Sequence, residues 1–222
     1  MEIDRFVKEE EEFLDEWAKE LPGFIKDGVV NPQEYFSAKY KILFLLKEVN
    51  GGKDWDLRDY LMEGGRKQTW DNGSRWVEGI LNLDKEIPWQ DIKEVDEEYR
   101  RKWLNKIAAV NVKKVSGGHT SDMKEIYRFA RENAERLCRQ INMYEPDIVI
   151  CGGTEGCYFD EITEYDDPKW EMTSRGIWYV VEPSKRIVIS YSHPEARVKD
   201  CLLYYGLIDA VREIVAKENM KK

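Results

Sequence analysis

The chain has 222 residues with 35 basic and 44 acidic side chains, and its formal net charge is −9. This length is sufficient for one domain with a substantial buried core. Hydrophobic residues make up 42% and aromatic residues 12% of the chain, and this composition excludes a disordered protein. The acidic balance argues against a protein that coats nucleic acid by bulk charge, although it permits a local basic cleft.

No apolar run approaches the roughly 18 residues of a membrane-spanning helix, so we expect no membrane partner. The N-terminus is acidic from its second residue, which is atypical of a signal or transit peptide. The four cysteines have no pairing typical of a metal site, so we expect reduced thiols and no metal. We therefore expect a cytoplasmic monomer without a cofactor. The cysteines are Cys138, Cys151, Cys157 and Cys201.

The N-terminal segment reads as an amphipathic helix over 3–20, because Phe6, Phe13 and Trp17 recur at helical spacing with acidic residues between them. A Leu-Pro-Gly sequence then ends the helix. Since no strong strand pattern precedes residue 41, we expect 1–38 to form an N-terminal helical appendage.

The rest of the chain alternates between continuous apolar runs and helical patterns. The apolar runs predict strands over 41–46, 107–112, 147–151, 177–182 and 186–191. Helices are expected over 55–62, 73–82, 89–104, 122–144 and 202–218, with Thr120 or Ser121 as the cap of the fourth. This alternation predicts a single α/β domain over 1–222, a three-layer α/β/α sandwich with a mostly parallel central sheet.

Polar side chains of three types stand at the ends of predicted strands. Glu48 follows the first strand, Asn111 ends the second and His193 follows the last. In an open α/β sheet, ligands bind in the crevice at the carboxyl ends of the strands. Each residue alone is typical of a cap or a turn, whereas the three together favour a binding or catalytic site at this edge.

Several segments resemble the uracil-DNA glycosylase superfamily. The sequence VNVKK over 110–114 is similar to the asparagine-containing strand end of that family, and 139–153 is similar to its helix, proline and buried strand ending in glycine. The segment 189–196 resembles its His-Pro-Ser loop, and 47–51 lies where its first motif follows the first strand. Glu48 matches the acid of the Gly-Glu-Ala-Pro-Gly version of that motif.

The resemblance covers roughly residues 40–215 and implies a uracil-DNA glycosylase-like fold with DNA as the partner. It implies a monofunctional DNA glycosylase that hydrolyses the N-glycosidic bond of a flipped uracil or modified pyrimidine and leaves an abasic site. Glu48 would orient water and stabilise the cationic sugar, Asn111 would read the base edge, and His193 would donate to O2 of the leaving base. Trp70 resembles the aromatic residue on which the base stacks, although a core position is an equally good interpretation. The segment Val49, Asn50 and Gly51 completes the expected base-binding set.

The chain also departs from the family pattern. Val49 stands where several branches have Asp or Asn, and Glu195 replaces the serine of the His-Pro-Ser loop. Val115 stands where the iron–sulfur branch has a cysteine, so we expect no cluster. The long segment between Glu48 and Trp70 predicts a pocket that tolerates a bulky 5-substituent on the pyrimidine, as in modified viral DNA. Both DNA repair and antiviral defence are compatible with this chemistry.

Basic residues beside these motifs are candidates for contacts with DNA phosphates. They are Arg66, Lys67, Lys113, Lys114, His119, Arg197 and Lys199. Two alternative functions stay open. One is a catalytically inactive nucleic-acid-binding module of the same fold, which the altered motifs favour. The other is a nucleoside or nucleotide hydrolase, which the net negative charge favours.

Overall fold

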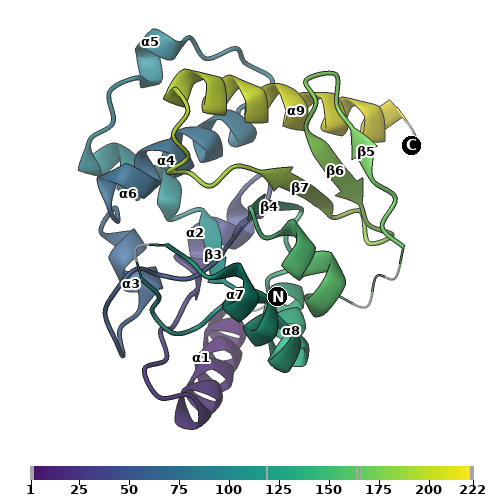
Figure 1. The fold of residues 1–222 in the computed structure, drawn as a ribbon. Helices are drawn as coiled ribbons and strands as arrows, with labels where there is room; N and C mark the ends of the chain where they lie inside the picture. Colours follow the sequence, from purple (N-terminus) through teal and green to yellow (C-terminus); the bar gives the residue numbers. More distant parts are fainter. Residues whose placement is uncertain (1–2, 119, 164, 166, 221–222) are drawn as a thin grey trace.

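The computed structural model describes residues 3–118, 120–163, 165 and 167–220, and a seven-stranded mixed sheet runs through them (Figure 1). The strand order is β1-β3-β2-β4-β7-β6-β5. The four central strands, β3, β2, β4 and β7, are parallel, and the outer strands β1, β6 and β5 are antiparallel to their neighbours. The strands are β1 (Gly28–Val29), β2 (Ile42–Leu46), β3 (Ile107–Asn111), β4 (Ile148–Gly152), β5 (Glu171–Met172), β6 (Trp178–Val181) and β7 (Ile187–Tyr191).

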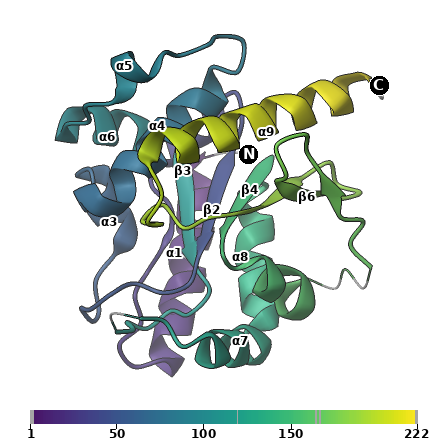
Figure 2. The same cartoon turned by 45° about the horizontal axis from the view of Figure 1, so that its top comes forward.

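Helices cover both faces of the sheet. Helices α4, α6 and α9 lie on one face, and α1, α7 and α8 lie on the other (Figures 1 and 2). The helices are α1 (Ile3–Glu20), α2 (Pro32–Ser37), α3 (Leu57–Met62), α4 (Lys67–Leu81), α5 (Trp89–Ile92), α6 (Glu97–Leu104), α7 (Met123–Glu132), α8 (Ala134–Tyr144), α9 (Asp200–Met220) and the π-helix η1 (Cys157–Ile162). The chain is therefore an α/β protein with a sheet buried between helical layers.

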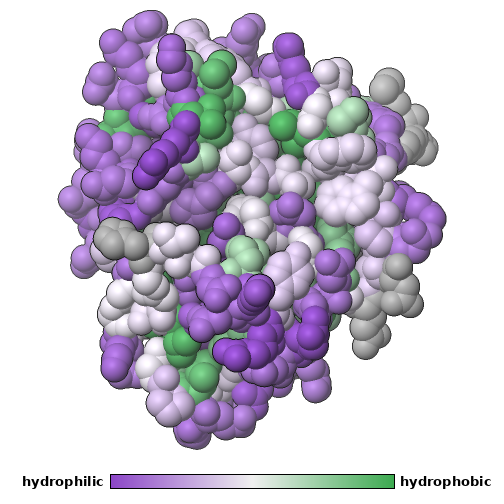
Figure 3. Space-filling view, viewed as in Figure 1, coloured by the Kyte–Doolittle hydropathy of each residue, from purple (hydrophilic) through white to green (hydrophobic). Residues whose placement is uncertain are grey.

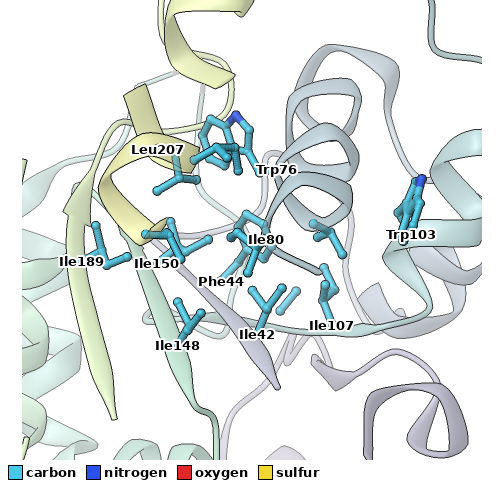
Figure 4. Packing of buried hydrophobic residues seen from close by; sticks show 14 of the residues in the cluster. Ile42, Phe44, Trp76, Ile80, Trp103, Ile107, Ile148, Ile150, Ile189 and Leu207 are labelled. Carbon is cyan, nitrogen blue, oxygen red and sulfur yellow. The ribbon is translucent and has the colours of Figure 1, made fainter. Parts of the chain in front are cut away.

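The alternation of side chains along the central strands explains why they are apolar throughout. In β2, Ile42 and Phe44 pack toward α4 and α9, whereas Leu43 and Leu45 pack toward α1 and α8. Figure 4 shows the first of these two cores, where Phe44 lies among side chains of the neighbouring strands and of α4 and α9. Because both faces are covered, every position of β2, β3 and β4 is buried.

The main strands lie where the apolar runs predict them, but two long helices were expected as continuous and are broken. The helix expected over 89–104 consists of α5 and α6, because Asp96 accepts a hydrogen bond from the Tyr99 amide at 2.7 Å and starts a new helix. The helix expected over 122–144 is interrupted at Asn133 between α7 and α8. Its N-terminal cap is Asp122, so the prediction of Thr120 or Ser121 is wrong.

The expectation of a purely helical appendage over 1–38 also needs correction. This segment contributes β1, which pairs antiparallel with β3 and extends the sheet at its edge. The Val30 amide continues the ladder by donating to the Ile107 carbonyl at 3.0 Å. A two-residue strand carries no periodic pattern, and for that reason the sequence does not reveal it.

The described part of the chain contains no helix that is both long and apolar enough to cross a membrane. It also contains no group of three or more His, Cys, Asp and Glu residues placed to hold a metal ion. Cys151 and Cys157 are buried in the core, and burial raises the pKa of Cys157 to about 12. This thiol is therefore protonated at neutral pH.

Candidate functional site

The connections that leave β2 and β3 run to opposite faces of the sheet. After β2 the chain forms helices α3 to α6 on one side of the sheet, and after β3 it forms α7 and α8 on the other (Figure 2). This divergence creates the kind of crevice in which open α/β sheets bind ligands. A cavity of about 680 Å³ opens there. It is lined by Leu46, Glu48, Val49, Asn50, Gly51, Gly52, Trp55, Leu57, Tyr60, Arg66, Thr69, Trp70, Asn111, Gly118, Ser121, His193 and Glu195.

The loops that follow β2 and β3 are joined by backbone hydrogen bonds beyond the strands. The Lys113 amide donates to the Lys47 carbonyl at 2.9 Å, and the Gly117 amide donates to the Val49 carbonyl at 2.9 Å. A β-carbon at position 117 would lie 2.0 Å from the carboxyl carbon of Glu48, so glycine is required for this close approach. The joined loops thus fix the Glu48 carboxylate beside the second loop.

Glu48 lies on the cavity wall with only 4% of its side chain exposed. Its carboxylate forms an ion pair of 2.8 Å with Lys113, which also pairs with Glu125 at 3.1 Å. Burial alone would lower the pKa of Lys113, but the hydrogen bonds to the two carboxylates outweigh it and raise that pKa. Lys113 is therefore charged at neutral pH and is engaged in orienting Glu48 rather than freely available to a phosphate.

Asn111 is the last residue of β3 and is only 3% exposed, yet it lines the cavity. Its backbone amide donates to Oδ2 of Asp27 at 2.7 Å. Its side-chain amide makes no hydrogen bond with any of the described residues. A donor and an acceptor are thus available side by side to a ligand in the cavity.

A buried polar cluster around Asp27 supports the backbone of Asn111. Asp27 Oδ1 accepts hydrogen bonds from Lys114 Nζ at 2.6 Å and from Gln140 Nε2 at 2.9 Å. The Lys114 side chain is completely buried, and burial lowers its pKa although Asp27 opposes this effect. The prediction that Lys114 contacts the DNA backbone is therefore wrong: its ammonium group stabilises the residue that holds Asn111.

His193 lies on the loop after β7 and lines the same cavity as Glu48 and Asn111. Its Nδ1 accepts a hydrogen bond from the Glu195 amide at 3.1 Å. Burial, together with the nearby cations Lys47 and Arg66, lowers the pKa of His193 to about 4. At neutral pH the imidazole is therefore neutral, with the proton on Nε2 and available as a donor.

This environment predicts an unusual titration. We expect the chemical shifts of the His193 ring protons, followed by NMR on the folded protein, to change with a midpoint near pH 4 rather than near the ordinary pKa of 6.5. Between these two pH values the unfolded chain binds the additional proton, so His193 destabilises the fold as the pH falls from 6.5 toward 4. The sequence has only two histidines, and a His119→Gln variant assigns the signals. A His193 midpoint near 6.5 would contradict the burial argument.

Glu195 connects the His193 loop with the start of α4. Its carboxylate accepts hydrogen bonds from Arg66 and from the hydroxyl of Thr69. In addition, the side-chain amide of Asn72 donates to the Pro194 carbonyl at 2.9 Å. The acid that replaces the expected serine is therefore neutralised by Arg66, and the pair fixes the loop that carries His193.

Trp70 is both a core residue and a wall of the cavity. It is only 3% exposed and packs edge-to-face against Phe44, with ring centroids 5.8 Å apart. Gly65 and Gly73 approach its indole so closely that a β-carbon at either position would clash with it. The ring is thus held rigidly. Stacking of a base on it stays a prediction.

The remaining predicted site residues divide into three groups. Val49, Asn50 and Gly51 line the cavity as expected. Lys67, Arg197 and Lys199 are exposed and form no ion pair with the described residues, so all three are available to a phosphate. His119 lies outside the described residues. The cavity is also lined by Trp55 and Tyr60, which sequence reasoning missed although two aromatic residues in a polar segment are a visible signal.

No protein-family model matches the sequence, and no curated protein matches it either. The inferred chemistry of the site therefore rests on its own residues.

Proposed function

We propose that the cavity is the base-excision site of a DNA glycosylase with a uracil-DNA glycosylase-like fold. The observation that carries this proposal is that Glu48, Asn111 and His193, from the ends of three different strands, line one cavity. The four parallel strands β3, β2, β4 and β7 support it, because the connections that follow β2 and β3 diverge to opposite faces of the sheet beside Glu48 and Asn111. The substrate is a uracil or modified pyrimidine that has been flipped out of the base stack.

Each residue has a role that fits its environment. The unpartnered amide of Asn111 binds an N–H and an adjacent carbonyl of the pyrimidine. The neutral His193 donates a hydrogen bond from its Nε2–H to O2 and keeps its proton, and this bond stabilises the negative charge that develops on the base as the bond between N1 and the sugar breaks. The Glu48 carboxylate stabilises the cationic sugar and orients the water that attacks its C1′ carbon. The products are the free base and an abasic site.

The experiment that tests this proposal treats single-stranded and duplex oligonucleotides with the protein and then with alkali. Each oligonucleotide carries one uracil or one modified pyrimidine. We expect strand breaks at the position of that base, since abasic sites are cleaved by alkali. A complete panel without strand breaks would contradict glycosylase activity.

A nucleoside hydrolase is the second candidate. The ion pairs of Lys113 with Glu48 and of Arg66 with Glu195 favour it, because they leave few cations at the cavity for a DNA backbone. This alternative predicts that free nucleosides are cleaved at least as fast as the same base in an oligonucleotide. The glycosylase proposal predicts the opposite order.

The cavity also bears on which pyrimidine is preferred. Gly51 adopts a positive φ of 78°, and a β-carbon there would meet no atom within 4 Å, so this part of the wall is open. We expect a pyrimidine with a bulky 5-substituent to be excised faster than plain uracil, because no side chain at this position excludes the substituent. Kinetics on oligonucleotides of matched sequence test this, and much faster excision of uracil than of every 5-substituted base would contradict it.

A further inference from the structure

Two aromatic residues of the cavity have no part in the mechanism above. Trp55 and Tyr60 line the same cavity as Glu48 and Asn111. Their rings meet edge-to-face with centroids 5.6 Å apart, and Tyr60 remains 42% exposed. An exposed aromatic ring at the rim of a cavity offers a flat apolar surface to a ligand.

Trp55 lies in the irregular loop before α3 and Tyr60 lies on α3, and both segments are fixed. The Trp55 indole rests on Gly52, where a β-carbon would lie 2.3 Å from Nε1. The Trp55 carbonyl accepts a hydrogen bond from the Lys26 amide at 3.1 Å, and the Leu57 amide donates to the Lys26 carbonyl at 2.8 Å. The Trp55 ring and the backbone that leads into α3 are therefore held in place before a ligand arrives, which lowers the entropic cost of stacking on this pair.

Ion pairing in the loop strengthens this anchoring. Arg58 is buried and pairs with Glu10 of α1 at 2.8 Å and with Asp56 at 2.6 Å. The segment that carries Trp55 and Tyr60 is thus tied to the N-terminal helix by charged hydrogen bonds. The segment is therefore a fixed part of the cavity wall.

The charge distribution makes such a surface important for binding DNA. The protein has a net charge of −9. Among the predicted phosphate contacts, Lys114 is buried, and Lys113 and Arg66 are neutralised by carboxylates. Lys67, Arg197 and Lys199 are exposed without an ion pair to the described residues, so few cations are left for phosphate contacts and we expect stacking of bases to add to the affinity that they supply.

We propose that Trp55 and Tyr60 form a stacking subsite for an unpaired nucleobase next to the base in the cavity. This inference rests on the proposed function and specifies its substrate class as single-stranded or locally unpaired DNA. In a duplex the neighbouring base is already stacked and paired, so the subsite stays empty unless that base is also released. In a single strand it is free to stack on the rings.

The test measures binding of fluorescein-labelled single-stranded and duplex oligonucleotides of one sequence by fluorescence anisotropy. We expect the single strand to bind more tightly. Trp55→Ala and Tyr60→Ala should each weaken its binding by roughly 5- to 150-fold, the range for losing one stacked base. Tyr60→Phe, which keeps the ring, should recover most of the affinity that Tyr60→Ala loses. Trp178→Ala is the matched control, because Trp178 is 49% exposed on β6 and does not line the cavity.

A second substrate identifies what occupies the subsite. It carries the same target base between two abasic nucleotides, so no neighbouring base can stack. With this oligonucleotide, Trp55→Ala and Tyr60→Ala should bind as the unaltered protein does. Equal loss of affinity with both oligonucleotides would overturn the inference and would assign the rings to the target base or its substituent.

The inference and the proposed function fail in different ways. If duplex and single strand bind equally and Trp55→Ala and Tyr60→Ala leave the DNA affinity unchanged, while base excision is observed, the stacking subsite is overturned and the proposed function is not. The absence of both binding and excision on every oligonucleotide would overturn the proposed function itself.

Discussion

Glu48→Gln is expected to lower the rate of base excision by about 10²-fold or more, while DNA binding changes little. The substitution keeps the shape and one acceptor of the side chain but removes the charge that stabilises the cationic sugar. Single-turnover kinetics on the preferred oligonucleotide measure the rate, and anisotropy measures the binding.

The matched control for this variant is Glu125→Gln. Glu125 shares Lys113 with Glu48 but does not line the cavity, so its loss removes a charge of the same cluster without touching the reacting groups. We expect a much smaller effect on the rate. Unchanged excision in Glu48→Gln would contradict its role and would direct attention to Glu195, the other carboxylate on the cavity wall. Asp56 is a poor substitute, because it pairs with Arg58 at 2.6 Å and does not line the cavity.

Lys114→Met is expected to lower the free energy of unfolding by about 3–5 kcal/mol, as is typical when one partner of a buried ion pair is removed. The charge of Asp27 would then be left buried without its cation. Urea denaturation measures the loss. The control is Lys199→Met, an exposed position without an ion pair to the described residues, where we expect a change within about 0.5 kcal/mol.

A double variant separates the charge from the packing at this site. Asp27→Asn combined with Lys114→Met removes both charges, and we expect it to recover part of the stability lost in Lys114→Met. Wild-type stability in the single variant, or no recovery in the double variant, would contradict the assignment of Lys114 to a buried ion pair that supports Asn111.

The sequence predicts the centre of the fold well because the central strands are buried on both faces. The runs that became β2, β3 and β4 are continuously apolar, and the polar residues that follow them are conspicuous for that reason. Glu48, Asn111 and His193 were therefore expected at one edge, and they do line one cavity. What they do there is a chemical proposal that neither the pattern nor the fold tests.

The errors arise where tertiary contacts decide the outcome. Lys113 and Lys114 are adjacent and chemically identical, yet the first pairs with Glu48 of the cavity wall and the second lies in the core. A signal for this difference exists: Val110, Val112 and Lys114 follow the two-residue alternation of a strand, which places Lys114 on the same inward face. Its partner Asp27 lies 87 residues earlier, and no local pattern connects them.

The central claim is tested most directly by the identity of the released product. The protein is incubated with a single-stranded oligonucleotide that carries one target pyrimidine, and free base and abasic sites are quantified by mass spectrometry. The account predicts free base and abasic sites in equal amounts, with release strongly reduced in Glu48→Gln. Intact oligonucleotide across the whole series of pyrimidines, or release of base from free nucleosides alone, would contradict it.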